Sequence, residues 1–375
     1  MTAPLLLLLA GCNHYDLFRV AGYQQESFTN NADIVFVIDN SGSMSEENTA
    51  LIDNLDVFIQ QLAGTGGSSS SDGLSAAVDN YIEVASRSAR FINFHIGVTS
   101  TDVENHYGAL FGPTPVMRFG DPNVVDAFTS AVDDAAVLGG SGNEEGLEAV
   151  FMALCRAVPD PPRPCFDPID QFTDADVLSN DGLIREHSAV IPVIITDEGD
   201  VSRRRADAGT GADGTPDEYD ALFQLFGKRM GWAVIGPEPG VCETGGITVP
   251  QWTVDRYRYF VDQTDGIWVP ISTGEPDCGV TDFASALQEI GDLINRLLTT
   301  FPLQAVPDPA TLRVYVDGHA VPESTGDGQG GFTSGWSYDP DTNAVSFHGD
   351  AVPGYDARVT IYYLPVSGEP RQPPF

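Results

Sequence analysis

The order of apolar and polar positions along the chain predicts strands and helices that alternate from residue 33 onward. Near-continuous apolar runs of strand length occur at 33–39, 91–102, 188–200, 230–238 and 266–272. Between them, apolar residues recur every three or four positions, as Leu51, Leu55, Phe58, Ile59 and Leu62 do in 46–63. Helices are predicted at 46–63, 74–89, 123–132, 144–158, 218–229, 253–264 and 282–301.

Apolar strands separated by amphipathic helices indicate a sheet that is covered on both faces. We therefore predict an α/β fold over residues 32–302: a doubly wound, mostly parallel, Rossmann-like sheet with helices on both faces. In such sheets ligands bind at the carboxyl ends of the strands. Asp39 and Asp197 each fall at such an end.

The pattern changes after Pro302, where short alternating strands are joined by Gly, Asp and Pro turns. Residues 303–368 are predicted to form a small β-sandwich-like domain, and 369–375 a tail. Alternating aromatic side chains in this region indicate core and cross-strand pairs, with a carbohydrate-binding platform as the less favoured alternative. The aromatic residues concerned are Trp336, Tyr338, Phe347, Tyr362 and Tyr363.

The first residues, MTAPLLLLLAGCN, contain a short apolar run that ends in Leu-Ala-Gly-Cys. This ending resembles the lipobox of bacterial lipoproteins, in which the cysteine is lipidated and becomes the mature N-terminus. We therefore expect a signal peptide over 1–12, lipidation at Cys12 and a polar tether over 13–31. The run is shorter than a usual signal core and lacks a preceding basic residue. No later stretch has the length of a transmembrane helix, so only this lipid is expected to touch the membrane.

Four cysteines remain after Cys12, an even number that indicates two disulfides in an exported protein. Of the three possible connectivities we favour the one in which each bond closes a local loop. The expected pairs are Cys155 with Cys165 and Cys242 with Cys278.

The net charge of −36, with Lys228 as the only lysine, argues against binding to nucleic acid or to anionic lipid headgroups. An acidic surface is compatible with divalent cations and with an extracellular or high-salt setting, and equally with a surface that only confers solubility.

The stretch NADIVFVIDNSGSMSEEN, residues 31–48, places a carboxylate and two hydroxyls in the turn after a buried strand. Asp39, Ser41 and Ser43 alternate along the chain, so their side chains are expected to converge on one point. Oxygen-only ligands suit a hard divalent cation. A simple helix N-cap is the alternative explanation.

VFVIDNSGSMS closely resembles the metal-ion-dependent adhesion site of von Willebrand factor A domains. The resemblance implies a further Asp at the end of a later strand, which VIITDEG supplies as Asp197. It also implies a Thr from a second loop, a position that GGSGNEEGLEA matches with Ser141. Glu144 follows Ser141 by three residues, and Glu198 and Asp200 lie with Asp197 in the stretch DEGD at the rim of the expected site. Glu144 and Glu198 are therefore possible additional ligands.

The lipobox, the site motif and the trailing β region together resemble the von Willebrand A lipoproteins of myxobacteria and related bacteria. The resemblance implies an exported, lipid-anchored protein of the outer membrane or cell surface. It also implies non-catalytic, cation-dependent binding of a protein or surface ligand, with Mg²⁺ the first choice and Ca²⁺ or Mn²⁺ the alternatives. A structural subunit that associates with itself is the second hypothesis. A hydrolase is the least favoured, because Ser41 lacks a nucleophile elbow and a partnered histidine.

Overall fold

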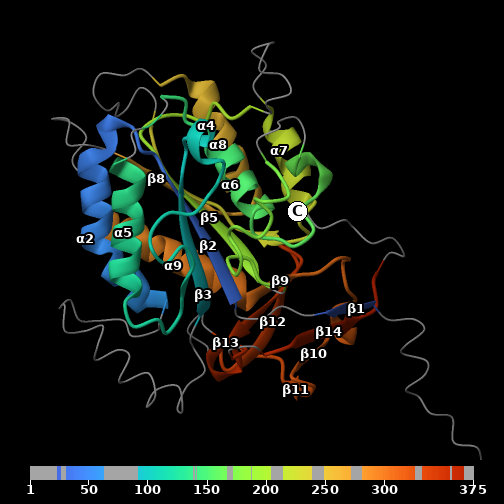
Figure 1. Ribbon diagram of the computed structural model, residues 1–375. Coiled ribbons are helices and arrows are strands. Elements are labelled where there is room, and N and C mark those ends of the chain that lie inside the picture. The colour runs from blue at the N-terminus through green and yellow to red at the C-terminus, as the bar shows by residue number, and fades with distance from the viewer. Residues whose placement is uncertain are drawn as a thin grey trace, which may run out of the picture.

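The computed structural model places an α/β domain beside a smaller β module (Figure 1). It describes residues 23–26, 31–62, 92–137, 140, 142–166, 172–186, 188–203, 214–238, 249–271, 281–325, 332–354 and 357–366. The expected signal peptide with Cys12, the predicted helix at 74–89, Ser141, Cys242 and Cys278 lie outside these residues.

The main sheet has the strand order β4-β3-β2-β5-β7-β8, with β6 paired to β5. All its strand pairs are parallel except β3 with β4, which are antiparallel. Numbered in chain order, this path is the 3-2-1-4-5-6 of a doubly wound sheet, and the order reverses between β2 and β5. The strands are β2 (Asn31–Ile38), β3 (Asn93–Ser100), β4 (Met117–Arg118), β5 (Ala189–Ile195), β6 (Arg229–Met230), β7 (Ala233–Gly236) and β8 (Ile267–Pro270).

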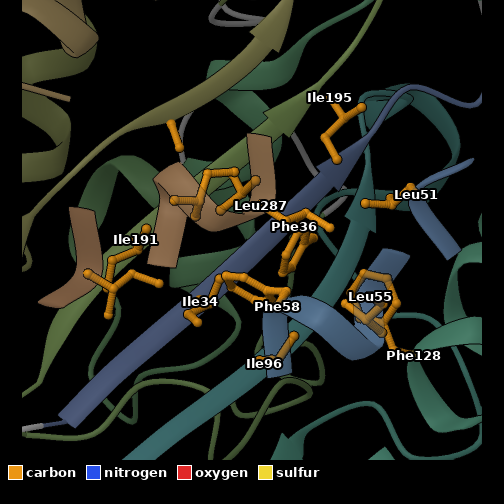
Figure 2. Packing of buried hydrophobic residues seen from close by; sticks show 14 of the residues in the cluster. Ile34, Phe36, Leu51, Leu55, Phe58, Ile96, Phe128, Ile191, Ile195 and Leu287 are labelled. Carbon is orange, nitrogen blue, oxygen red and sulfur yellow. The ribbon is translucent and has the colours of Figure 1, made fainter. Parts of the chain in front are cut away.

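Strand β2 is buried along its whole length, which explains its unbroken apolar sequence. Ile34 and Phe36 face one hydrophobic core, whereas Val35 and Val37 face a second core on the opposite side of the sheet. In the first core, the ring of Phe36 meets Phe58 and Phe128 edge-on at centroid distances of 5.8 and 4.9 Å (Figure 2).

Helices cover both faces of the sheet, as predicted (Figure 1). Residues of α2, α5 and α9 belong to the first core, and residues of α6, α7 and α8 belong to the second. Within the described part of the chain, no helix is both long and apolar enough to cross a membrane. The helices are α2 (Ser45–Leu62), α4 (Val103–His106), α5 (Val124–Val137), α6 (Gly146–Cys155), α7 (Pro216–Gln224), α8 (Gln251–Gln263) and α9 (Phe283–Thr299).

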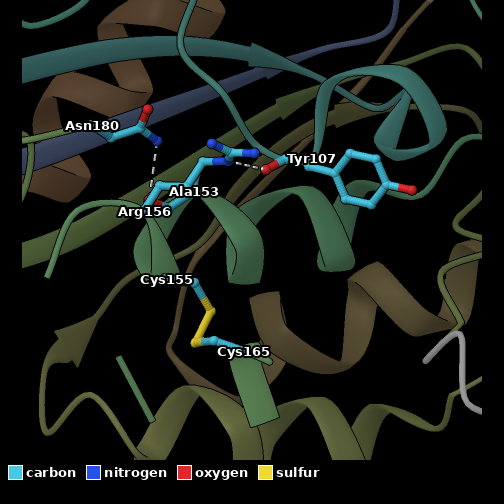
Figure 3. Close-up of a disulfide and its surroundings, with 6 residues drawn as sticks. All are labelled: Tyr107, Ala153, Cys155, Arg156, Cys165 and Asn180. Carbon is cyan, nitrogen blue, oxygen red and sulfur yellow. Dashed lines mark hydrogen bonds between the residues drawn. A yellow bond between two sulfur atoms is a disulfide. The ribbon is translucent and has the colours of Figure 1, made fainter. Parts of the chain in front are cut away.

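The predicted disulfide between Cys155 and Cys165 is present. It joins the end of α6 to a short 3-10 turn, and both cysteines are buried. Beside it, the Arg156 Nε donates to the Tyr107 carbonyl and the Asn180 Nδ2 to the Ala153 carbonyl, at 2.6 and 3.2 Å (Figure 3). These bonds hold the C-terminal end of α6 to the neighbouring loops.

The β module consists of two antiparallel sheets, with strand orders β1-β14-β10-β11 and β12-β13-β9. One hydrophobic core contains residues from both sheets, including Phe301, Val314, Phe347 and Ile361. The strands are β1 (Tyr23–Glu26), β9 (Thr300–Pro302), β10 (Arg313–Val316), β11 (His319–Val321), β12 (Gly335–Asp339), β13 (Ala344–His348) and β14 (Val359–Tyr363).

Of the five aromatic residues predicted as core and cross-strand pairs, three lie in the core of the module and Tyr362 is exposed. Trp336, Phe347 and Tyr363 are buried in the core. The Trp336 indole donates to the Val321 carbonyl, and the Tyr363 hydroxyl accepts from the Ala305 N–H. Their polar atoms are thus used inside the module.

Two predicted boundaries need correction. The expected tether, 13–31, contains strand β1, which pairs with β14 in the C-terminal sheet, and its last residue, Asn31, begins β2. The predicted boundary after residue 302 falls too late, because β9 already pairs with β13. Both strands are short, and their partners lie far away in the sequence, so no local pattern marks them.

Candidate metal centre

The candidate site lies where the strand order of the main sheet reverses. The carboxyl ends of β2 and β5 meet there, and the Asp39 N–H donates to the Ile195 carbonyl at 2.9 Å. The end of β3 joins them, because the Thr101 N–H donates to the Ile38 carbonyl at 3.1 Å. Three adjacent strands therefore deliver their following loops to one place.

The loop after β2 forms a tight turn around the buried carboxylate of Asp39. Its Oδ1 accepts the Ser41 N–H at 2.8 Å. This turn brings the hydroxyl oxygens of Ser41 and Ser43 to 2.9 Å from each other. A 3-10 turn, Gly42–Met44, then leads directly into α2. Asp39, Ser41 and Ser43 thus lie in one turn, with the two hydroxyls adjacent and the Asp39 carboxylate bonded to the Ser41 backbone.

The loop after β5 is tied to this turn by Thr196. Its hydroxyl donates to Asp39 Oδ2 at 2.7 Å and accepts the Glu198 N–H at 3.0 Å. The next residue, Asp197, is only 1% exposed, and among the described residues neither of its carboxylate oxygens has a hydrogen-bond partner. Glu198 is partly exposed at the rim of the site.

The third contribution comes from the loop before α6. Glu144 is 1% exposed; its Oε2 accepts the Thr101 hydroxyl, and its Oε1 has no partner among the described residues. Ser141, the residue matched to the family's threonine, lies outside the described residues. The neighbouring Gly140 N–H donates to the Asn40 carbonyl, which places this loop against the Asp39 turn.

The carboxyl groups of the site influence one another. Burial, together with the charge of Asp197, raises the pKa of Asp39 to about 6, although hydrogen bonds from Ser41 and Thr196 act in the opposite direction. Burial and the charges of Asp39, Glu198 and Asp197 raise the pKa of Glu144 to about 8. The pKa of Glu198 is raised by burial and by Asp197. Burial is the largest cause of all three increases, and the neighbouring carboxylates add to it.

Asp200, expected at the same rim, is instead engaged elsewhere. It is buried, and its Oδ2 accepts the Arg256 Nε of α8 at 2.7 Å. Its Oδ1 accepts the Ser202 hydroxyl and the Leu147 N–H. Asp200 therefore joins the loop after β5 to α6 and α8 and is not available as a ligand.

Helix α8 packs very closely against both acidic loops. A Cβ on Gly146 would lie 2.3 Å from the Tyr257 hydroxyl, and one on Gly199 would lie 1.8 Å from Thr253 Oγ1. Only glycine allows these approaches. The buried Tyr257 hydroxyl has no hydrogen-bond partner in the described part of the chain, and burial, with the charges of Asp200, Glu144 and Asp39, raises its pKa well above the usual value.

Several residues of this site escaped the sequence analysis. Thr101 and Thr196 follow β3 and β5 directly, and each hydroxyl bonds a site carboxylate. In the sequence, each is a hydroxyl residue near the carboxyl end of a predicted strand, 91–102 or 188–200. The side-chain amide of Asn40 is buried with both polar atoms unpartnered among the described residues. Nothing in its sequence position marked it.

The donor set fits a hard divalent cation. Carboxylate and hydroxyl oxygens are the ligands that Mg²⁺ and Ca²⁺ take, and the two orphaned oxygens of Asp197 need a positive partner. Neighbouring ligands of an octahedral Mg²⁺ lie about 2.9 Å apart, like the two serine hydroxyls. Within the described ranges, no three His, Cys, Asp or Glu side chains are placed to hold a metal ion.

The strand order of the main sheet is that of a doubly wound α/β fold, and the solved structures similar to this chain include a von Willebrand factor type A protein. No protein-family model and no curated protein matches the chain. A von Willebrand factor type A protein from Catenulispora acidiphila is 11% identical, with a TM-score of 0.35 over 94% of this chain and 66% of that one. The manganese-loaded TRAP protein of Plasmodium vivax is 15% identical, with a TM-score of 0.31 over 82% of this chain and 92% of that one.

The open conformation of the pilus adhesin SpaC from Lactobacillus rhamnosus GG is also similar. It is 13% identical, with a TM-score of 0.37 over 89% of this chain and 38% of that one. The chain thus spans less than two thirds of both the SpaC and the Catenulispora structures. At these identities the similarity concerns the fold alone.

Proposed function

We propose that the chain is a non-catalytic binding protein whose site holds a divalent cation. Asp39, Ser41, Ser43, Ser141 and Asp197 are the proposed ligands, with Mg²⁺ as the first choice and Ca²⁺ or Mn²⁺ as alternatives. A coordination position left free by the protein takes an oxygen of a protein or surface ligand. Glu144 and Glu198 are additional candidate ligands.

The observation that carries this proposal is the buried carboxylate of Asp197 beside the Asp39 turn. A buried charge without a partner costs several kcal/mol, so native proteins pair such groups or give them a metal. Among the described residues both oxygens of Asp197 lack donors. The hydroxyls of Ser41 and Ser43 are the neutral oxygens that complete such a donor set without adding charge repulsion.

The position of the site suits a ligand that approaches from outside the molecule. Figure 1 shows the carboxyl ends of β2 and β3 at the end of the sheet remote from the β module. Strand β1, the first described element, belongs to that module and so lies at the opposite end. With export and a lipid on Cys12, both part of this proposal, the cation site would face away from the membrane.

The alternatives remain a structural subunit that assembles through the site, and, least favoured, a hydrolase. Metal-dependent self-association in analytical ultracentrifugation would favour the first. Against the second, the Ser41 hydroxyl contacts Ser43 Oγ, not a histidine. One of the similar structures, SpaC, is named as a pilus adhesin, and for this chain adhesion is part of the proposal.

The experiment is thermal and urea unfolding of the full chain in chelator and with Mg²⁺, Ca²⁺ or Mn²⁺. A cation that binds only the folded state adds about 2.7 kcal/mol at 100 times its dissociation constant. We expect this gain in wild type and its loss in Asp39→Asn and Asp39→Ala. Asp53→Asn is the matched control, because Asp53 is an exposed acid of α2. An equal gain in the Asp39 variants would place cation binding on the general acidic surface and overturn the proposal.

A further inference from the structure

A surface cavity of about 400 Å³ lies between the N-terminal end of α7 and one face of α8. Trp252, Asp255 and Tyr259 line it from α8, where spacings of three and four residues place them on the same side of the helix. The volume is within the range of ligand pockets in proteins. The cavity uses none of the proposed cation ligands.

The cavity combines aromatic rings with carboxylates. Trp252 is 52% exposed, an unusual state for the largest aromatic side chain. The Tyr259 hydroxyl donates to Asp217 Oδ1 at 2.9 Å, so a second carboxylate is bonded to a residue of the cavity wall. Aromatic faces and carboxylates together attract cations, since the ring quadrupole presents its negative face.

An anion is a poor match for the same cavity, although the end of α7 and Arg256 both border it. Arg256 already donates through Nε to Asp200 and through Nη2 to the Ser202 carbonyl, at 2.7 and 2.5 Å. The end of α7 is closed by its own capping box, in which Thr215 and Glu218 bond each other's backbone N–H. The first turn also carries Asp217. The positive groups around the cavity are therefore already engaged.

We propose that this cavity binds an arginine or lysine side chain of a basic segment in a protein partner. Charge complementarity supports a basic partner, because the chain carries −36 and a single lysine. That lysine, Lys228, bonds the carbonyls of Arg185 and Glu186. This inference rests on the proposed function in one respect: it takes from it that the partner is a protein. The cavity itself is lined by none of the proposed cation ligands.

The two sites share a helix. The Thr253 carbonyl of α8 accepts the Asp200 N–H at 3.1 Å, and Arg256 borders the cavity while holding the side chain of Asp200. The loop that carries Asp197 is thus fixed to the helix that carries Trp252 (Figure 1). A partner engaged in the cavity would contact the same rigid unit that presents the cation.

The test is binding of a fluorescent octapeptide of alternating Gly and Arg, measured by anisotropy in chelator and again with Mg²⁺. The matched probe replaces each Arg by citrulline, which keeps the shape and removes the charge. We expect Trp252→Leu and Asp255→Asn each to weaken binding of the Arg peptide about five-fold or more. Trp252→Phe, which keeps an aromatic face, should retain most of it. The citrulline peptide should bind weakly to every variant.

Two control variants separate the cavity from general attraction to an acidic protein. Phe332→Leu removes another exposed ring and Asp341→Asn another exposed acid, both in the β module. Neither should change the affinity. The inference would be overturned if wild type, Trp252→Leu and Phe332→Leu bound the Arg peptide with equal affinity. It would also be overturned if Trp252→Leu weakened the binding of a neutral oligosaccharide but not that of the Arg peptide. Loss of the Mg²⁺ effect on unfolding, with peptide binding intact, would contradict only the proposed function.

Discussion

The Thr196 hydroxyl donates a hydrogen bond of 2.7 Å to Oδ2 of Asp39, and this bond joins the loops after two adjacent parallel strands. The Thr196 hydroxyl oxygen also accepts the Glu198 N–H. One side chain therefore fixes both the carboxylate of the first loop and the backbone of the second. The relative position of Asp39 and Asp197 therefore depends on Thr196.

Replacing Thr196 by Val removes this donor while keeping the shape of the side chain. We expect the free energy of unfolding in chelator to fall by about 1–3 kcal/mol, because Asp39 Oδ2 and the Glu198 N–H both lose their partner. Urea denaturation measures this loss. Thr196→Ser should behave nearly as wild type. Thr49→Val, which removes an exposed hydroxyl of α2, should cost much less; an equal loss at both positions would contradict the assigned role.

Changing Asp197 to Asn should have opposite effects with and without metal. In chelator we expect a gain of about 1 kcal/mol or more, because an unpartnered buried charge disappears. In Mg²⁺ the stabilising effect of the cation should be lost. Urea denaturation of both proteins under both conditions provides the comparison. If the variant were less stable than wild type in chelator, the carboxylate would have a partner that stabilises it.

The metal-free protein should lose stability as the pH rises from about 5 to 8. Burial, then the charge of Asp39, raises the pKa of Glu144 from 4.5 to about 8, so the folded chain holds a proton that the unfolded chain has released. The free energy of unfolding therefore falls across this interval, by at most about 1.4 kcal/mol per pH unit for one such group. Asp39 contributes likewise between 3.8 and about 6.

Glu144→Gln isolates this effect because it cannot ionise. Its unfolding temperature in chelator should depend less on pH than that of wild type between pH 6 and 8. Added Mg²⁺ favours the ionised carboxylates, so its apparent affinity in wild type should increase with pH. A pH profile of wild type that matches that of the variant would show that Glu144 does not titrate in this range.

The contact between Gly146 and Tyr257 predicts a non-additive pair of mutations. In Gly146→Ala the new methyl group meets the Tyr257 hydroxyl at 2.3 Å, and such overpacking costs about 1–3 kcal/mol. Tyr257→Phe alone should be close to neutral, because its hydroxyl has no partner among the described residues. The double variant should therefore lose less than Gly146→Ala. A double-mutant cycle from urea denaturation measures the coupling, and strictly additive losses would contradict it.

Much of the α/β domain could be predicted because its pattern is local. The apolar run Ile34–Ile38 stays unbroken since both faces of β2 are covered, and the helix-period spacing of Leu51, Leu55 and Phe58 reflects one buried face of α2. Strand β1 could not be found in this way. Its sequence, Tyr-Gln-Gln-Glu, has no apolar alternation, and its partner β14 lies at the other end of the described chain.

The site shows the same division. Asp39, Ser41 and Ser43 could be placed in one turn because they are neighbours in the sequence, and Asp197 because it ends a recognisable strand. The hydrogen bond from Thr101 to Glu144 depends on how two loops meet across the sheet. Asp200 was expected at the rim from its sequence position. Its carboxylate instead accepts a hydrogen bond from Arg256, which follows it by 56 residues in the sequence. Such long-range pairings leave no local signal.

The pairing of β1 with β14 has a consequence for biosynthesis. Strand β1 leaves the ribosome before the α/β domain, whereas its partner β14 is made after all of that domain. Strand β1 therefore stays without this partner until the chain has been made past Val359. The four-stranded sheet of the β module can therefore close only after the chain has been made as far as β14.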